Sequence, residues 1–231
     1  MTQTIFETSA DMFARSTDVT IAAGLYRRGR LFVDAMRQCV RAGGPVLDYG
    51  CGPGRIAAML AQEGFLVDGR DPSAGMIAAA QSLPHDPRRL SFTCVDDCGD
   101  GLRDGAYAGI VCSSVIEFVP EPARLLSNLR RAAKPGAMLA LSYSNSRSLW
   151  RSYAKWRHGA GQPHYAVQCN VWTFEETKRM LADAGFTVTA PPVFLECAPF
   201  DKRPALKALS ALERVGSLGF VTAAPAPRAG A

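Results

Sequence analysis

The chain has 231 residues, of which 48% are hydrophobic and 20% charged, and its formal net charge is +5 at pH 7. A chain of this length can bury one sizeable core, so we predict a single α/β domain over residues 1–231. The positive charge is too mild to predict nucleic-acid binding, although it fits a small acidic substrate. The seven cysteines are odd in number and scattered, and with only three histidines they predict neither a disulfide framework nor a metal site.

The amino-terminal part is expected to be helical. Leu31, Phe32, Met36 and Val40 recur at helical spacing before two glycines end the pattern, so residues 1–43 are predicted to be N-terminal cap helices. No apolar run approaches the ~20 residues that span a bilayer. The polar start MTQTIFETSADMF lacks the features of a signal peptide. We therefore expect a soluble, cytoplasmic protein.

The stretch VLDYGCGPG, residues 46–54, organises the rest of the chain. It predicts a strand that ends in an acid, a tight turn with three glycines, and the start of a helix. Glycines allow positive φ and let a ligand approach the backbone, while the opening helix offers N–H groups to an anion. The spacing G-x-G-x-G differs from the dinucleotide pattern G-x-G-x-x-G. With Asp48 at the strand end, this turn suits a ligand that carries both an ammonium and a carboxylate.

This stretch resembles motif I of the class I S-adenosylmethionine (SAM) dependent methyltransferases, in the small-molecule group that includes ubiquinone and menaquinone biosynthetic enzymes. The resemblance implies SAM as the cofactor. It also implies a doubly wound, seven-stranded, mostly parallel Rossmann-like sheet whose last strand is antiparallel. Its specific motifs cover residues 44–145, the expected SAM-binding core, and it extends more loosely over 172–190.

Two further acids follow the next two predicted strands. Asp71 lies about 20 residues past the glycine loop, where doubly wound folds place an acid that accepts the ribose hydroxyls. After the third strand, the family places an acid that accepts from the adenine amino group; Asp96 aligns best, Asp97 is the fallback, and a turn role is the alternative. The predicted cofactor-binding residues are Asp48, Gly50, Cys51, Gly52, Gly54, Asp71, Pro72, Met76, Asp96, Asp97 and Ser113.

The fourth strand departs from the family pattern. Ala108 replaces the usual acid, and Phe118 stands where many relatives carry a histidine after Glu117. No base is therefore assigned at this strand, and Ser113 and Ser114 are expected to line the site. The catalytic candidates that remain are His158 and His164 as general bases, because histidine titrates in the useful range, and Tyr143 or Tyr165 as groups that orient the acceptor.

Residues 146–171 are rich in aromatic and basic side chains. Leu149, Tyr153 and Trp156 share one helical face, with basic residues on the other. Three interpretations stay open: a substrate lid inserted after the fifth strand, a helix packed on the core, and a basic helix on a membrane surface. The side chains expected to contact a small-molecule substrate are Phe13, Tyr26, Trp150, Tyr153 and Tyr165.

The remaining elements complete the predicted sheet. Thr173 and Glu176 form a capping-box pattern at the start of a helix. Residues 172–224 are expected to form the C-terminal part of the sheet, and residues 225–231 a disordered tail. The other predicted elements are a helix over 121–133, a strand over 137–141 after a Lys-Pro-Gly turn, strands over 186–189 and 219–223, and a helix over 205–215.

The expected reaction is methyl transfer from SAM to an oxygen of a small aromatic or acidic molecule, with nitrogen as the second choice. No N-P-P-Y-type tetrapeptide follows the fourth strand, which argues against methylation of adenine or glutamine amides. Two other hypotheses are kept. The missing histidine and aspartate suggest a non-catalytic SAM-binding regulatory subunit, and the glycines alone suggest an NAD-dependent oxidoreductase.

Overall fold

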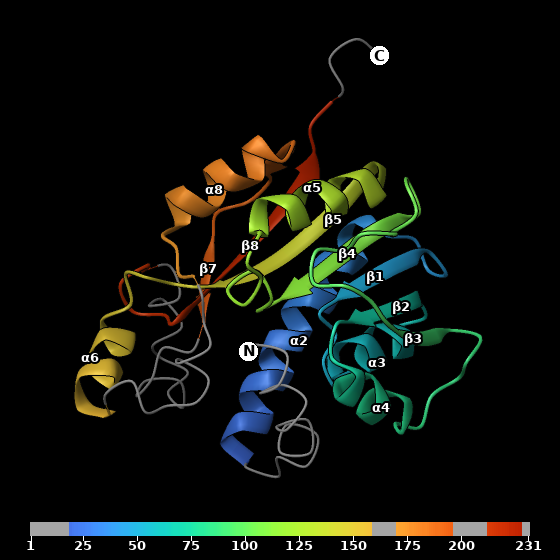
Figure 1. Ribbon diagram of the computed structural model, residues 1–231, viewed down its shortest axis with the longest axis horizontal. Helices are drawn as coiled ribbons and strands as arrows, with labels where there is room; N and C mark the ends of the chain where they lie inside the picture. Colours follow the sequence, from blue (N-terminus) through green and yellow to red (C-terminus); the bar gives the residue numbers. More distant parts are fainter. Residues whose placement is uncertain (1–18, 159–169, 196–211, 228–231) are drawn as a thin grey trace.

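Strands and helices alternate along the chain, and the strands join one sheet between two layers of helices (Figure 1). The computed structural model describes residues 19–158, 170–195 and 212–227. The strands are β1 (Pro45–Tyr49), β2 (Leu66–Asp71), β3 (Leu90–Cys94), β4 (Tyr107–Ser113), β5 (Ala133–Ser144), β6 (Phe186–Val188), β7 (Val193–Leu195) and β8 (Leu218–Pro225). The helices are α2 (Val19–Cys39), α3 (Arg55–Gln62), α4 (Ala74–Gln81), α5 (Pro122–Ala132), α6 (Leu149–His158) and α8 (Phe174–Asp183).

The strand order confirms the doubly wound sheet. Within the described residues the sheet has eight strands in the order β3-β2-β1-β4-β5-β8-β6, with β7 paired to β8. Strand β1 pairs in parallel with β2 and β4, whereas β8 runs antiparallel to β5 and β6. The eighth strand, β7, was not predicted because its three residues follow two prolines and are too short to show a pattern. It forms because β8 offers a free edge to Val193–Leu195.

Each face of the sheet buries its own core. Helices α2, α3 and α4 cover one face (Figure 1). Phe32 and Met36 of α2 belong there to one buried cluster with Ala140 of β5. Helices α5 and α8 cover the other face, where Leu139 and Leu141 of β5 pack with helix side chains. Alternate residues of a strand point to opposite faces, so even-numbered residues of β5 face α2. This alternation decides which side chains of β5 reach the site.

Several predicted boundaries shift. Lys-Pro-Gly does not form a separate turn after α5 but lies inside β5, with Gly136 at φ 73° and a register shift against β4. Of the helix predicted over 205–215, the described residues 212–215 are not helical, with 213–215 in a turn, and residues 205–211 lie outside the described part. Residue 225, where the tail was predicted to begin, still belongs to β8, because Pro225 pairs with Phe186; residues 228–231 lie outside the description.

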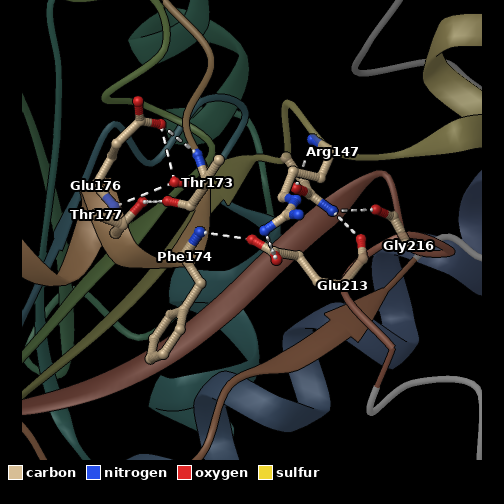
Figure 2. A network of polar contacts seen from close by, with 8 residues as sticks. Arg147, Thr173, Phe174, Glu176, Thr177, Glu213 and Gly216 are labelled. Atoms are coloured by element: carbon tan, nitrogen blue, oxygen red, sulfur yellow. Dashed lines mark hydrogen bonds and ion pairs between the residues drawn. The ribbon is translucent and has the colours of Figure 1, made fainter.

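A polar network holds the end of β5 to the start of α8 and to the turn before β8 (Figure 2). Asn145, fully buried, donates to the backbone oxygens of Glu213 and Gly216. The Glu213 carboxylate accepts from the backbone N–H of Phe174 at 2.8 Å and pairs with Arg147 at 3.3 Å. The predicted capping box of Thr173 and Glu176 is present beside it. The network therefore fixes where the chain leaves the sheet toward α6.

None of the helices in the described ranges is long and apolar enough to cross a membrane.

We expect Gly219→Ala to destabilise the fold. Gly219 of β8 pairs with Tyr143 of β5, and a Cβ at this glycine would collide with the tyrosine ring. Overpacking of a rigid core typically costs about 1–3 kcal/mol of unfolding free energy. Chemical denaturation measures the loss. In a double-mutant cycle with Tyr143→Ala, the double mutant should lose less unfolding free energy than the sum of the two single-mutant losses. Full additivity would contradict the contact.

Candidate functional site

A pocket lies at the carboxyl ends of β1, β2 and β4, where open α/β sheets bind ligands. Most of the predicted cofactor-binding residues line it: Asp48, Gly50, Cys51, Gly52, Asp71, Pro72, Met76, Asp97 and Ser113. Gly54 and Asp96 do not. The lining residues that the sequence did not single out are Arg28, Pro53, Arg55, Ile56, Val115, Val119 and Pro120.

The glycine loop joins β1 to α3, and each of its three glycines has a positive φ. A Cβ at Gly50 would overlap the side chain of Val115, whereas a Cβ at Gly52 would meet nothing within 4 Å. The open side of Gly52 is therefore room for a ligand at the backbone. Gly54 serves packing instead, because a Cβ there would lie 2.6 Å from Cζ of Phe92. As the N-cap of α3, Gly54 also offers the first turn no side-chain acceptor.

Asp71 holds the loop in place. Its Oδ2 accepts the backbone N–H of Gly52 at 2.8 Å, and its Oδ1 accepts that of Ser73, which precedes α4, at 2.9 Å. Burial raises the pKa of Asp71, and the two N–H donors act against that rise. Each carboxylate oxygen has a second lone pair, so Asp71 can still accept hydrogen bonds from a ligand in the pocket.

Asp48 is a buried carboxyl without a counter-charge among the described residues. It is 1% exposed, and neither of its oxygens has a hydrogen-bond partner among the described residues. Burial, and then the nearby charge of Asp71, raises the pKa of Asp48 from 3.8 to about 7, although the backbone N–H of Ala57 in the first turn of α3 acts against that rise. A buried carboxylate is costly unless a cation or hydrogen-bond donors satisfy it. Beside the open glycine backbone, this group can bind a cationic ligand.

Asp96 and Asp97 occupy different positions in the loop after β3. The Asp96 carboxylate accepts the backbone N–H groups of Cys98 and Asp100, and its backbone oxygen accepts from the hydroxyl of Tyr49. It therefore shapes the loop, which was the alternative role for this position. Asp97 lines the pocket. The geometry favours the fallback residue for contact with a ligand.

The end of β4 forms the other wall of the pocket. Ser114 has φ 54°, and it is the non-glycine residue of the described chain with a positive φ. Such strained positions persist where the surroundings hold them, and they cluster at functional sites. Its backbone N–H donates to Oγ of Ser142 at 3.0 Å, and its Oγ accepts from Arg28 of α2 at 3.0 Å. No local pattern in the sequence predicts that Arg28 lies at this wall, because it is 86 residues from Ser114.

Tyr143 does not reach the pocket. The predicted acceptor-orienting role does not fit, because odd-numbered residues of β5 face α5 and α8, and Tyr143 is fully buried in that core. Tyr26 does not line the pocket either: it is 61% exposed on the first turns of α2, which extend beyond the sheet (Figure 1), and Arg28 lines it instead.

The other predicted catalytic and substrate residues stay predictions. Phe13, His164 and Tyr165 lie outside the described residues, and His158 ends α6 with its side chain outside the description. Trp150 and Tyr153 lie on α6 with ring centroids 5.4 Å apart, and neither is among the residues that line the pocket.

The sheet order and the glycine-loop pocket define a methyltransferase class of α/β domain. Residues 25–190 match the methyltransferase domain family, so the chain belongs to this family, and the resemblance inferred from its glycine loop is confirmed. Family membership identifies SAM as the cofactor and leaves the NAD-dependent oxidoreductase without support.

Individual relatives are more distant. A ubiquinone biosynthesis O-methyltransferase of Coxiella burnetii is 32% identical over 111 residues, which are 47% of each chain. The chain thus spans about half the length of the curated relatives it matches. Magnesium protoporphyrin IX methyltransferase of Synechocystis, solved with bound S-adenosylhomocysteine (SAH), has a TM-score of 0.66 at 21% identity over 88% of this chain and 84% of its own. The 1,6-didemethyltoxoflavin N1-methyltransferase of Burkholderia thailandensis has a TM-score of 0.66 at 16% identity, over 97% and 87%. These solved structures share the fold.

Proposed function

We propose that this chain transfers the methyl group of SAM to an oxygen of a small molecule. The observation that carries the proposal is Asp48, a buried carboxyl without a counter-charge among the described residues, beside the open backbone of Gly52. The ammonium of the methionine part of SAM is a cation that satisfies such a group. A regulatory subunit that binds SAM without chemistry remains the second hypothesis, and acceptor-dependent turnover separates the two.

The residues of the pocket fit the other parts of SAM. Asp71, at the carboxyl end of β2, can accept the ribose hydroxyls while it keeps its two bonds to the loop. Asp97 supplies an acceptor for the adenine amino group, and Met76 and Pro72 supply apolar wall. The cofactor contributes an electrophilic methyl group on a sulfonium. The protein contributes position, since proximity and orientation alone can be worth roughly 7–11 kcal/mol of the barrier.

The acceptor binds, in this proposal, at the wall formed by the end of β4 and by Arg28. Apolar side chains of Val115, Phe118 and Val119 lie next to the polar Ser113 on this wall. Small-molecule sites commonly combine such apolar lining with a few polar groups. The name of one relative, a ubiquinone biosynthesis O-methyltransferase, supports a small molecule methylated on oxygen.

Calorimetric titration with SAH and with NAD tests the cofactor, and a coupled assay for SAH release with phenols, catechols and amines tests the reaction. We expect micromolar SAH binding, no binding of NAD, and SAH release that depends on an added acceptor. SAH binding without turnover on any acceptor would favour the regulatory subunit. Absence of SAH binding would contradict the whole assignment.

Affinity for SAH should rise with pH. Asp48 must be ionised to pair with the ligand ammonium, and burial places its pKa at about 7 in the unliganded protein. Below that pKa the affinity should fall by up to about tenfold per pH unit, because binding expels one proton. Titrations at pH 6 in two buffers of different ionisation enthalpy measure that proton. As a control, SAH binding to Glu117→Gln should release the same proton, since this substitution leaves Asp48 unchanged. An SAH affinity that does not depend on pH would contradict the pairing of Asp48 with the ligand ammonium.

A further inference from the structure

A second buried carboxyl, Glu117, lies in the segment between β4 and α5. It is 1% exposed. Its Oε1 accepts from the hydroxyl of Ser144 at 3.1 Å, and its Oε2 has no hydrogen-bond partner among the described residues. A buried oxygen without a partner is uncommon in a native structure, and it calls for an explanation such as a missing ligand or a catalytic role. The proposed cofactor contacts do not use this group.

Glu117 lies on the face of the sheet that α2 covers. Ser142 pairs in register with Phe220 of β8, whose ring packs edge-on against Phe32 of α2 with centroids 5.1 Å apart. Ser144 is two residues further along β5 and therefore points to the same face. Its bond to Glu117 places the carboxyl on that face, where Arg28 and the pocket also lie.

The carboxyl is adjacent to the proposed acceptor wall. Ser114 and Val115 precede Glu117 and line the pocket, and Phe118 and Val119 follow it and line the pocket as well. Glu117 itself does not line the pocket, so Oε2 reaches a ligand at this wall only if the side chain changes rotamer when the acceptor binds. Nearby, Arg28, Ser114 and Ser142 form a hydrogen-bonded chain on the same wall.

The electrostatic surroundings suit proton transfer. Burial raises the pKa of Glu117 to about 7, although its own backbone N–H, the bond from Ser144 and the charges of Arg28 and Arg151 act against that rise. The serine and the two arginines come from β5, α2 and α6, and the thiol of Cys112 on β4 is a further titratable neighbour. A general base works best when its pKa lies near the operating pH. No histidine is among the described residues that line the pocket.

We propose that Glu117, held by Ser144, is the general base that takes the proton of a hydroxyl acceptor in this chain. The inference rests on the proposed methyl transfer and narrows its acceptor to a phenol or another hydroxyl compound. As the acceptor oxygen bonds to the methyl carbon, the carbon–sulfur bond breaks and its electron pair stays on sulfur, which yields neutral SAH. The acceptor proton passes to Oε2 of Glu117 and returns to water after the product leaves. Phe118, in place of the family histidine, forms apolar wall beside this base.

The test compares wild type, Glu117→Gln and the control Glu121→Gln, an exposed glutamate four residues away on the same segment. Turnover is measured at saturating SAM from pH 5.5 to 9. The acceptors are a series of hydroxyl compounds that includes 3,4-dihydroxybenzoate, and amine and thiol compounds for comparison. In the wild type, kcat should rise with pH and level off above about 7, as Glu117 ionises. Glu117→Gln should lower kcat at least about 100-fold and abolish the rise of kcat between pH 5.5 and 7. SAH affinity should stay within about twofold in both variants, which shows that the protein is folded.

The possible outcomes distinguish an error in the base assignment from an error in the proposed methyl transfer. If kcat of Glu117→Gln lay within threefold of wild type, or still rose with pH as in the wild type, the base assignment would be wrong. The proposed methyl transfer would not be affected. Wild-type turnover with amine or thiol compounds alone would likewise contradict the base assignment. SAH binding without turnover on any probe would overturn the proposed function itself.

Discussion

Asp48→Asn should abolish cofactor binding and, at the same time, stabilise the protein without ligand. The ammonium of SAM or SAH loses the charge that balances it, and breaking a buried ion pair costs about 3–5 kcal/mol. We therefore expect SAH affinity to fall at least about 100-fold, as measured by calorimetric titration.

The stability change follows from the pKa of Asp48. Because its folded-state pKa lies above the unfolded-state value, the neutral carboxyl contributes stability below about pH 4 that is lost as the pH rises through 7. A pKa raised from 3.8 to about 7 corresponds to about 4 kcal/mol lost on ionisation. Asparagine cannot ionise, so Asp48→Asn should raise the melting temperature at pH 8 and leave it nearly unchanged at pH 4.

The control is Asp183→Asn, which removes an exposed aspartate at the end of α8. It should change neither SAH affinity nor the pH dependence of stability. If Asp48→Asn kept SAH affinity within threefold, the ammonium would bind elsewhere in the pocket. A lower melting temperature at pH 8 would show that the contact of the ionised carboxylate with the backbone N–H of Ala57 outweighs the cost of its burial.

Asp71→Asn should also weaken SAH binding, by at least about tenfold, but with the opposite effect on stability. The amide can accept from only one of the two backbone N–H groups that the carboxylate now serves, so either Gly52 or Ser73 loses its acceptor. An unsatisfied buried donor costs about 1–3 kcal/mol. Calorimetry with SAH and chemical denaturation at pH 7 measure the two losses.

Asp68→Asn is the matched control on the same strand. Asp68 is an aspartate of β2 that pairs with Arg70 at 2.8 Å and accepts from Tyr107, and it does not line the pocket. Its replacement should lower stability without changing SAH affinity. Equal losses of affinity in the two variants would mean that Asp71 acts only through the general stability of β2.

Most residues of the proposed cofactor-binding part of the site could be predicted from short sequence motifs. Gly50 and Gly52 adopt positive φ, and such a turn after a strand requires glycine wherever it occurs. Asp48 and Asp71 end parallel neighbouring strands, so their positions in the sequence already predicted that they would meet at one edge of the sheet. Asp96 and Asp97 show the limit of this reasoning, because a loop decides which of two adjacent carboxylates points inward.

The sequence by itself determined the α/β class and the order of most elements, because these depend on periodicity, capping and turn chemistry within short segments. The cofactor followed from the resemblance of the glycine loop to the methyltransferase motif. The tertiary structure alone decided the rest of the wall. Arg28 is 86 residues from Ser114, and only the packing of α2 on the sheet brings them together. Tyr143 and Ser144 are neighbours in sequence, yet strand alternation buries one in the core beneath α5 and α8 and turns the other toward Glu117. A choice of face depends on which helices cover the sheet, and no pattern within β5 contains that information.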